Sequence, residues 1–193
     1  ITPVGQGGSH PSLIITAGDL PQLRHACGVG DAAAAPPQWG KFGRRSSDYQ
    51  ALRNHVAHGD VGQPLPGELL AAAFLHLMDP DDPRDAARLD LINRAFRNPN
   101  WVTGDIMEMV VVLDWCWGDL APPARRALML ALREQAEPFA ATDSPLYPRV
   151  FRKNLASLAL ALAIDEEDEP NPSWRRLRQS LLEDGRQYVL KTL

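Results

Sequence analysis

A group of basic residues precedes an asparagine late in the chain, and these residue types could bind an anion. Arg149, Arg152 and Lys153 come before Asn154, which opens an apolar run. If a helix begins at Asn154, its free N–H groups and its dipole favour negative charge at that point. Asn154 and the basic residues could then bind one anion together. The structural alternative is that Asn154 only caps the helix and the basic side chains are solvated.

Two aromatic residues in neighbouring connections could complete this site. Trp101 follows Asn98-Pro99-Asn100, and Tyr147 lies in the long connection before Arg149. Both offer an aromatic face to a sugar ring, so the six residues together predict a subsite for an anionic sugar. Screening of a sugar carboxylate makes the adjacent C–H more acidic, which is the first requirement of an elimination. An elimination also needs a base and an acid near the leaving oxygen, and these residues supply no complete pair.

Three acidic residues on or beside one apolar segment allow a different chemistry. A glycoside hydrolase uses two carboxylates that flank the bond, and Asp105, Glu108 and Asp114 are the candidates. Asp114 stands in a segment that is otherwise almost wholly apolar, and a buried carboxylate needs a partner. We favour a structural ion pair for Asp114, with Arg125 or Arg126 as the partner.

The sequence offers no convincing metal site, and we expect no cofactor. His55 and His58 stand three residues apart, but the chain places no third and fourth ligand near them. The acidic run at residues 165–169 lacks the alternating ligands and the glycine of a calcium-binding loop. We expect it to be a solvated loop.

The elements that must position these residues form a repeating pair, in which a nearly all-apolar segment precedes a segment with one apolar face. The all-apolar segments are expected to be buried helices, and the one-faced segments half-buried helices. The central segment carries the β-branched run Val110–Val112, which argues for a strand, but the one-faced helix after it favours helix. The three pairs are 67–78 with 84–97, 105–117 with 122–138, and 154–164 with 174–190. Two layers of helices follow, which is the pattern of an incomplete α/α toroid or an α-solenoid.

Shorter elements precede the three pairs. One helix is expected from a cap at Thr16 or Asp19 to about Cys27, and another from Ser46 or Ser47 to near Gly59. We expect residues 1–9 to be a flexible leader and residues 10–193 to form one all-α domain. No glycine or proline follows Gly185 to end the last helix before the final residue, so we expect the domain to be part of a larger protein or to have been cut.

Composition sets broad limits on partners. The chain has 193 residues, 45% of them hydrophobic and 23% charged, with a net charge of -4. The charge gives no basic field for nucleic acid, and no apolar run approaches the ~20 residues that span a bilayer. The two cysteines, Cys27 and Cys116, are too few for a disulfide framework, and Cys116 is expected to be a core thiol.

Three stretches together resemble the N-terminal domain of heparinase II/III-like polysaccharide lyases. HPSLIITAGDLPQLR is similar to the opening signature of that family, and VVVLDWCWGDLAPPARRAL to a helix and the turn that follows it. RKNLASLALALAI is similar to the helix that carries an asparagine near its start, and Asn154 is the matching position. Leu155 stands where relatives often have asparagine, histidine or tryptophan.

The resemblance implies both a fold and an activity. It implies an incomplete α/α toroid, normally followed by a β-sandwich, and cleavage of uronic-acid polysaccharide by β-elimination in a secreted or periplasmic enzyme. Asn154 would help to neutralise the uronate carboxylate, and this chain would form one wall of the cleft. The expected partners are an acidic polysaccharide and the β-sandwich part of the same protein. The alternatives are a helical scaffold that binds glycan or protein without catalysis, and a toroid glycoside hydrolase.

Overall fold

The computed structural model describes most of the chain from His10 onward. The described residues are 10, 13–26, 29, 47–57, 66–97, 106–135, 148–164 and 168–192, and for some residues at helix ends, including 148–153 and 188–192, only the backbone is described. The predicted leader, residues 1–9, lies outside these ranges.

Within these ranges the secondary structure is entirely helical, as the sequence predicts. The helices are α1 (Leu20–Ala26), α2 (Ser47–Ala57), α3 (Pro66–Met78), α4 (Asp85–Arg97), α5 (Ile106–Trp115), α6 (Pro122–Gln135), α7 (Pro148–Ala163) and α8 (Pro172–Thr192). The segment predicted at 105–117 is therefore helical over Ile106–Trp115, and burial of its valines outweighs their strand preference.

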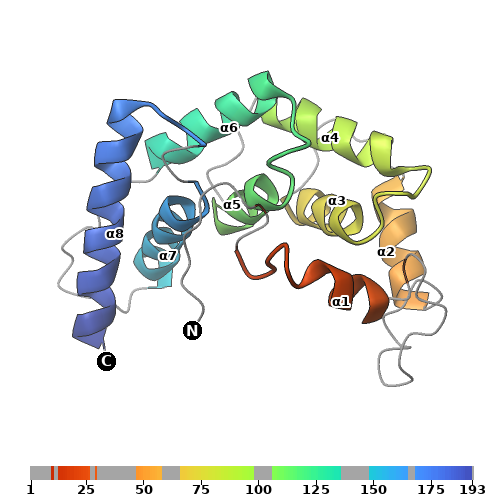
Figure 1. Cartoon of the computed structure of the whole chain (residues 1–193), viewed down its shortest axis with the longest axis horizontal. Helices are drawn as coiled ribbons and strands as arrows, with labels where there is room; N and C mark the ends of the chain where they lie inside the picture. Colours follow the sequence, from red (N-terminus) through yellow and green to blue (C-terminus); the bar gives the residue numbers. More distant parts are fainter. Residues whose placement is uncertain are drawn as a thin grey trace.

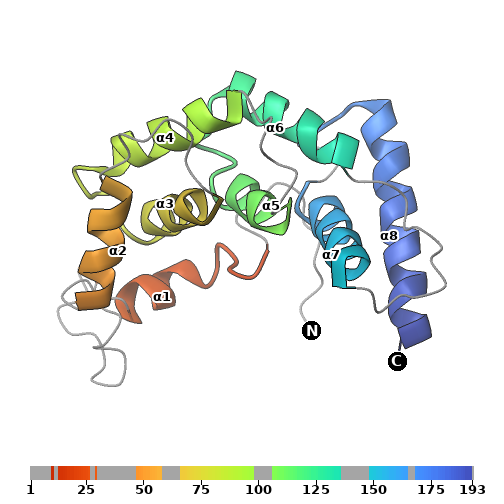
Figure 2. The ribbon, with the colours of Figure 1, turned by 180° about the vertical axis from the view of Figure 1, so that it is seen from behind.

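The helices form two curved rows. Helices α3, α5 and α7 lie side by side in an inner row, and α2, α4, α6 and α8 follow the outside of the arc (Figure 1). The reverse view in Figure 2 shows the same order, with α1 against α3 on the inner side. Each all-apolar helix packs against the one-faced helix that follows it, because both bury apolar surface in that contact. The prediction of an all-α fold is confirmed for the described residues.

The core lies between the two rows and is centred on α5. Every side chain from Met109 to Asp114 is buried, and Cys116 is a buried free thiol, as expected. Burial raises the pKa of that thiol, so Cys116 is an inert core residue. The outer helices contribute large side chains such as Phe96, Leu128 and Trp174.

Four of the described helices begin at a proline, and the start of one of them, α7, differs from the start predicted from the sequence. Helices α3, α6, α7 and α8 start at Pro66, Pro122, Pro148 and Pro172. Proline suits the first helical position, where its missing N–H would have no helical partner and its φ is already set. The prediction that a helix begins at Asn154 is wrong, because α7 begins at Pro148 and Asn154 lies within it. Helix α7 is also less buried than predicted, since Leu155 and Leu162 are exposed.

A close approach between α7 and α8 occurs at Gly185, which is buried in α8. A Cβ at this position would lie 2.6 Å from Leu158 Cδ1. Overpacking of this kind costs about 1–3 kcal/mol, and the helix preference of alanine over glycine returns up to about 1 kcal/mol. We expect Gly185→Ala to lower the free energy of unfolding by about 1 kcal/mol in urea denaturation. In a Leu158→Ala background the loss should vanish, and an equal loss there would refute the steric explanation.

Candidate functional site

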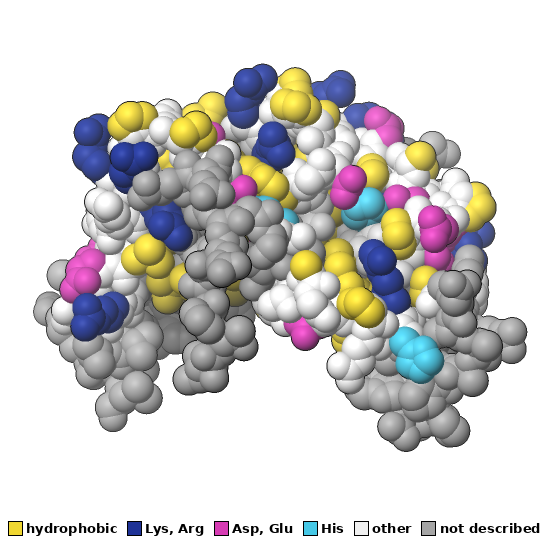
Figure 3. Space-filling model, viewed as in Figure 1, with side chains coloured by type: hydrophobic (Ala, Val, Ile, Leu, Met, Phe, Trp, Pro, Cys, Tyr) yellow, Lys and Arg dark blue, Asp and Glu magenta, His cyan; other side chains and the backbone are white. Residues whose placement is uncertain are grey.

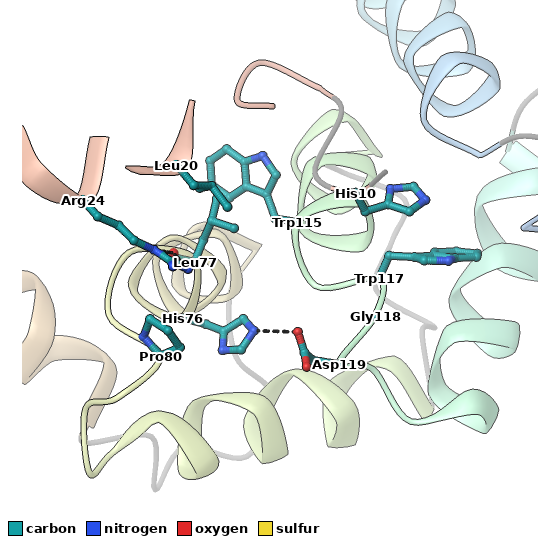
Figure 4. A pocket seen from close by; sticks show the side chains of 10 residues that line it. All are labelled: His10, Leu20, Arg24, His76, Leu77, Pro80, Trp115, Trp117, Gly118 and Asp119. Carbon is teal, nitrogen blue, oxygen red and sulfur yellow. Dashed lines mark hydrogen bonds and ion pairs between the residues drawn. The ribbon is translucent and has the colours of Figure 1, made fainter. Parts of the chain in front are cut away.

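A partly open pocket of about 340 Å³ lies at the inner side of the rows, where α1 meets the ends of α3 and α5 (Figure 4). Its lining includes two tryptophans, two histidines, an arginine and an aspartate. These residues are His10, Arg24, His76, Trp115, Trp117 and Asp119. On the face drawn in Figure 3, histidine and acidic side chains adjoin one another among hydrophobic ones.

His76 is held between two carboxylates. It lies in the last turn of α3, and its Nδ1 is 2.8 Å from Oδ2 of Asp85, in the first turn of α4. Its Nε2 is 3.2 Å from Oδ2 of Asp119, in the turn after α5. An ionised carboxylate only accepts hydrogen bonds, so when both are ionised, both ring nitrogens of His76 donate. The pair with Asp85 therefore fixes the orientation of the imidazole.

Asp85 is in contact with a buried cluster of charged side chains. Arg88 Nη1 lies 3.6 Å from Asp85 Oδ1, and Arg88 Nη2 donates to Asp82. Asp82 also accepts from Arg53 Nε at 2.6 Å and from the backbone N–H of Arg84 at 3.0 Å. The bond from Arg53 leads the causes that hold the pKa of Asp82 well below its usual range. The cluster ties α2, the turn before α4 and α4 together.

His10 is the second histidine of the pocket, and both of its nitrogens are occupied. Nδ1 lies 2.7 Å from Asp114 Oδ1, and Nε2 lies 3.1 Å from Asp168 Oδ2. Burial lowers the pKa of His10, but the hydrogen bonds and charges of the two aspartates outweigh it and raise the pKa to about 9. His10 is therefore a cation at neutral pH and not a free base. It links its own segment to Asp114 and to Asp168.

The tryptophans differ in what surrounds them. The ring of Trp117 packs against His10 at 5.1 Å between centroids, and the Arg125 guanidinium lies 4.6 Å from its centroid. Trp115 is less buried than Trp117, and its Nε1 donates to Leu13 O at 3.2 Å. Trp115 therefore has more aromatic surface available to a ligand.

Arg24 brings a guanidinium to the pocket from α1. Its Nε and Nη2 donate to Leu77 O at 3.0 and 2.8 Å. This contact holds α1 against the end of α3 and fixes the plane of the guanidinium. Among the described residues the structure gives Nη1 no hydrogen-bond partner, so this nitrogen can donate to a ligand.

The residues predicted around Asn154 are not brought together with this pocket. Asn154 is buried, with 6% of its surface exposed, so it has little surface to offer a sugar. Its position inside α7 also removes the argument from free N–H groups at a helix start. Arg149, Arg152 and Lys153 lie in the first turns of α7, but their side chains are outside the described set. Trp101 and Tyr147 also lie outside the described residues.

The acidic candidates have other surroundings than the sequence suggests. Asp114 is fully buried, as expected, but its carboxylate bonds to His10 and to the N–H of Leu13, at 2.8 Å, in place of the predicted Arg125 or Arg126. Held in this way, Asp114 is a structural group. Glu108 is half-buried on α5, and Asp105 lies outside the described residues.

Two further expectations concern metals and the acidic run. His55 is exposed and lies 3.6 Å from Glu68, while His58 falls outside the described residues. Across the described part of the chain, no group of three or more histidine, cysteine or acidic side chains is placed to hold a metal ion. The acidic run is not wholly solvated, since the Asp168 side chain is largely buried against His10.

Sequence reasoning missed the residues that line the pocket. His10, His76 and Asp119 come from three separate segments, so no local spacing joins them. One signal was present for His76, a histidine in an otherwise apolar helix, because a polar group buried there needs partners. In the structure one of these partners is Asp85, nine residues later.

Comparisons with known proteins leave the family open. Family models, curated proteins and solved structures were all compared with the chain, and none matches it. Within the described ranges, no helix combines the length and the apolar character needed to cross a membrane.

Proposed function

We propose that this chain binds acidic polysaccharide through the pocket between α1, α3 and α5. The observation that carries the proposal is the composition of the pocket, which combines tryptophan faces with Arg24 and His76. A sugar ring presents apolar C–H faces that pack on aromatic rings, and a uronate adds one carboxylate that a guanidinium binds in a charge-assisted way. Aromatic walls with a few placed polar groups are typical of small-ligand sites.

We further propose that the chain is the N-terminal helical domain of a lyase that cleaves uronate polysaccharide by β-elimination. The two curved rows of paired helices support an open α/α toroid. The pocket lies where α1 meets the ends of α3 and α5, and would form part of one wall of a substrate cleft. Arg24 Nη1 and His76 are placed to screen a uronate carboxylate, which is the requirement that the sequence analysis assigned to Asn154. Because Asn154 is buried, we assign carboxylate binding to the pocket.

The proposal is tested by binding and by ultraviolet absorbance. The chain is titrated calorimetrically with oligosaccharides of alginate, chondroitin and heparan type, and with neutral cello-oligosaccharides. Preference for a uronate oligosaccharide supports the binding site, and equal or absent binding refutes it. Elimination creates a conjugated double bond that absorbs in the ultraviolet, whereas hydrolysis does not. Binding without new absorbance would favour the non-catalytic scaffold.

Arg24→Gln should weaken binding of the preferred uronate oligosaccharide about tenfold. A hydrogen bond between charged groups contributes about 1.5–3 kcal/mol, and tenfold corresponds to about 1.4 kcal/mol. The matched control is Arg97→Gln, which removes the same charge from an exposed position on α4. If both variants weaken binding equally, the effect is one of net charge, and Arg24 does not contact the sugar.

A further inference from the structure

We propose that Asp119 occupies, in the free protein, the position in which the carboxylate of a uronate ligand binds, and that the ligand displaces it from His76. This inference rests on the proposed binding of acidic sugars in the pocket. It adds that the subsite is already filled by an internal carboxylate. Its ligand is therefore a group of the same charge and shape as the Asp119 side chain.

The two carboxylates on His76 are held very differently. The side chain of Asp85 is 10% exposed, as is that of His76, whereas the side chain of Asp119 is 60% exposed. The Asp85 contact is 2.8 Å long and the Asp119 contact is 3.2 Å. An exposed ion pair contributes little to stability, because water competes for both partners. Asp85 is thus the fixed orienting group, and Asp119 is the one that a ligand can replace.

Displacement of Asp119 requires no change of fold. Its backbone N–H donates to Cys116 O at 3.0 Å, which holds the turn after α5. Among the described residues the structure gives its carboxylate one partner, His76. Rotation of the side chain into solvent therefore frees Nε2 of His76 and leaves the turn, the Asp85 contact and the pocket walls in place.

A uronate bound in this position would make more contacts with the pocket than the Asp119 side chain makes. Figure 4 shows the His76 imidazole directed at Asp119, with the Arg24 side chain entering the pocket from α1. A uronate can use the His76 donor through its carboxylate while its ring packs on Trp115. Asp119 opposes this binding in two ways, since it occupies the donor and repels a second negative charge.

Asp119→Ala should therefore bind a uronate oligosaccharide more tightly than the unaltered chain. The apparent affinity for the ligand equals the intrinsic affinity multiplied by the fraction of molecules in which the site is free. Because Asp119 lowers this fraction, its removal should tighten binding about threefold to tenfold. The experiment is calorimetric titration with the alginate-, chondroitin- and heparan-type oligosaccharides. The matched control is Asp81→Ala, an equal charge change at an exposed position in the turn before α4. Binding of cello-oligosaccharides should be unchanged in both variants.

The outcomes separate this inference from the function on which it rests. If the unaltered chain prefers uronates and Asp119→Ala binds no tighter than Asp81→Ala, displacement is overturned and the proposed function stands. If neither the unaltered chain nor Asp119→Ala binds a uronate, both fall. Adding His76→Asn to Asp119→Ala should abolish the gain, and the melting temperature of each variant shows that it is folded. A gain that survives without His76 would also overturn the inference.

Discussion

Replacing His10 with alanine should lower the free energy of unfolding by about 3 kcal/mol. His10 is the cationic partner of Asp114, whose side chain is fully buried. Removing one partner of a buried ion pair leaves an uncompensated charge, which typically costs about 3–5 kcal/mol. The bond from the N–H of Leu13 to Asp114 does not involve the imidazole, and it keeps the loss at the lower end. Urea denaturation at neutral pH measures the effect, and His25→Ala, an exposed histidine on α1, is the control.

The same contact should make stability depend on pH in the alkaline range. The pKa of His10 rises from 6.5 to about 9 in the folded protein. A raised pKa stabilises the fold fully below pH 6.5, and this contribution is lost as the pH rises through about 9. The difference in unfolding free energy between the unaltered chain and His10→Ala should therefore shrink across this window. A constant difference would show that His10 acts by packing on Trp117 and not by its charge.

Asp82→Ala should also cost about 3 kcal/mol of unfolding free energy. The carboxylate is buried and binds both Arg53 and Arg88. Without it, the contact that the buried guanidinium of Arg88 retains among the described residues is the longer one with Asp85. Chemical denaturation measures the loss. Asp90→Ala, which breaks an exposed pair with Arg94, serves as the control and should cost less than about 1 kcal/mol.

Acid should remove the contribution of Asp82. Its pKa in the folded protein lies well below the ordinary value of 3.8, with Arg53 as the leading cause. A lowered pKa stabilises the fold above the unfolded value and loses this effect as the pH falls through the folded value. The gap between the unaltered chain and Asp82→Ala should hold at neutral pH and narrow below 3.8. A gap that narrows already near pH 6.5 would point instead to histidine.

The helices could be predicted because their signals are local. Apolar periodicity identified the buried and half-buried helices, and the prolines at 122 and 123 marked the start of α6. The start of α7 was misplaced because the basic residues Arg149, Arg152 and Lys153 resemble a connection, although Pro148 carried the correct signal. The toroid and the lyase activity stay predictions, since they depend on more than the periodicity of this chain.

The pocket could not be predicted because its contacts are not local. His76 and Asp119 are 43 residues apart, and His10 meets Asp114 across 104 residues. Asp114 was recognised as a buried carboxylate that needs a partner, yet several cations could have served. The sequence indicates that Asp114 needs a partner, but the packing of the helices determines which cation lies within reach of it.

The clamp at His10 has a consequence for how the protein is made. Its two bonds join His10 to residues 104 and 158 positions later in the chain. During synthesis the helices up to α5 can form their local pairs as they emerge, but His10 has its first partner only after Asp114 and its second only after Asp168. Contacts between such distant residues form slowly, because the chain loses the entropy of closing the loop before the contacts stabilise it. The N-terminal segment should therefore be protected from proteases only after Asp168 has left the ribosome.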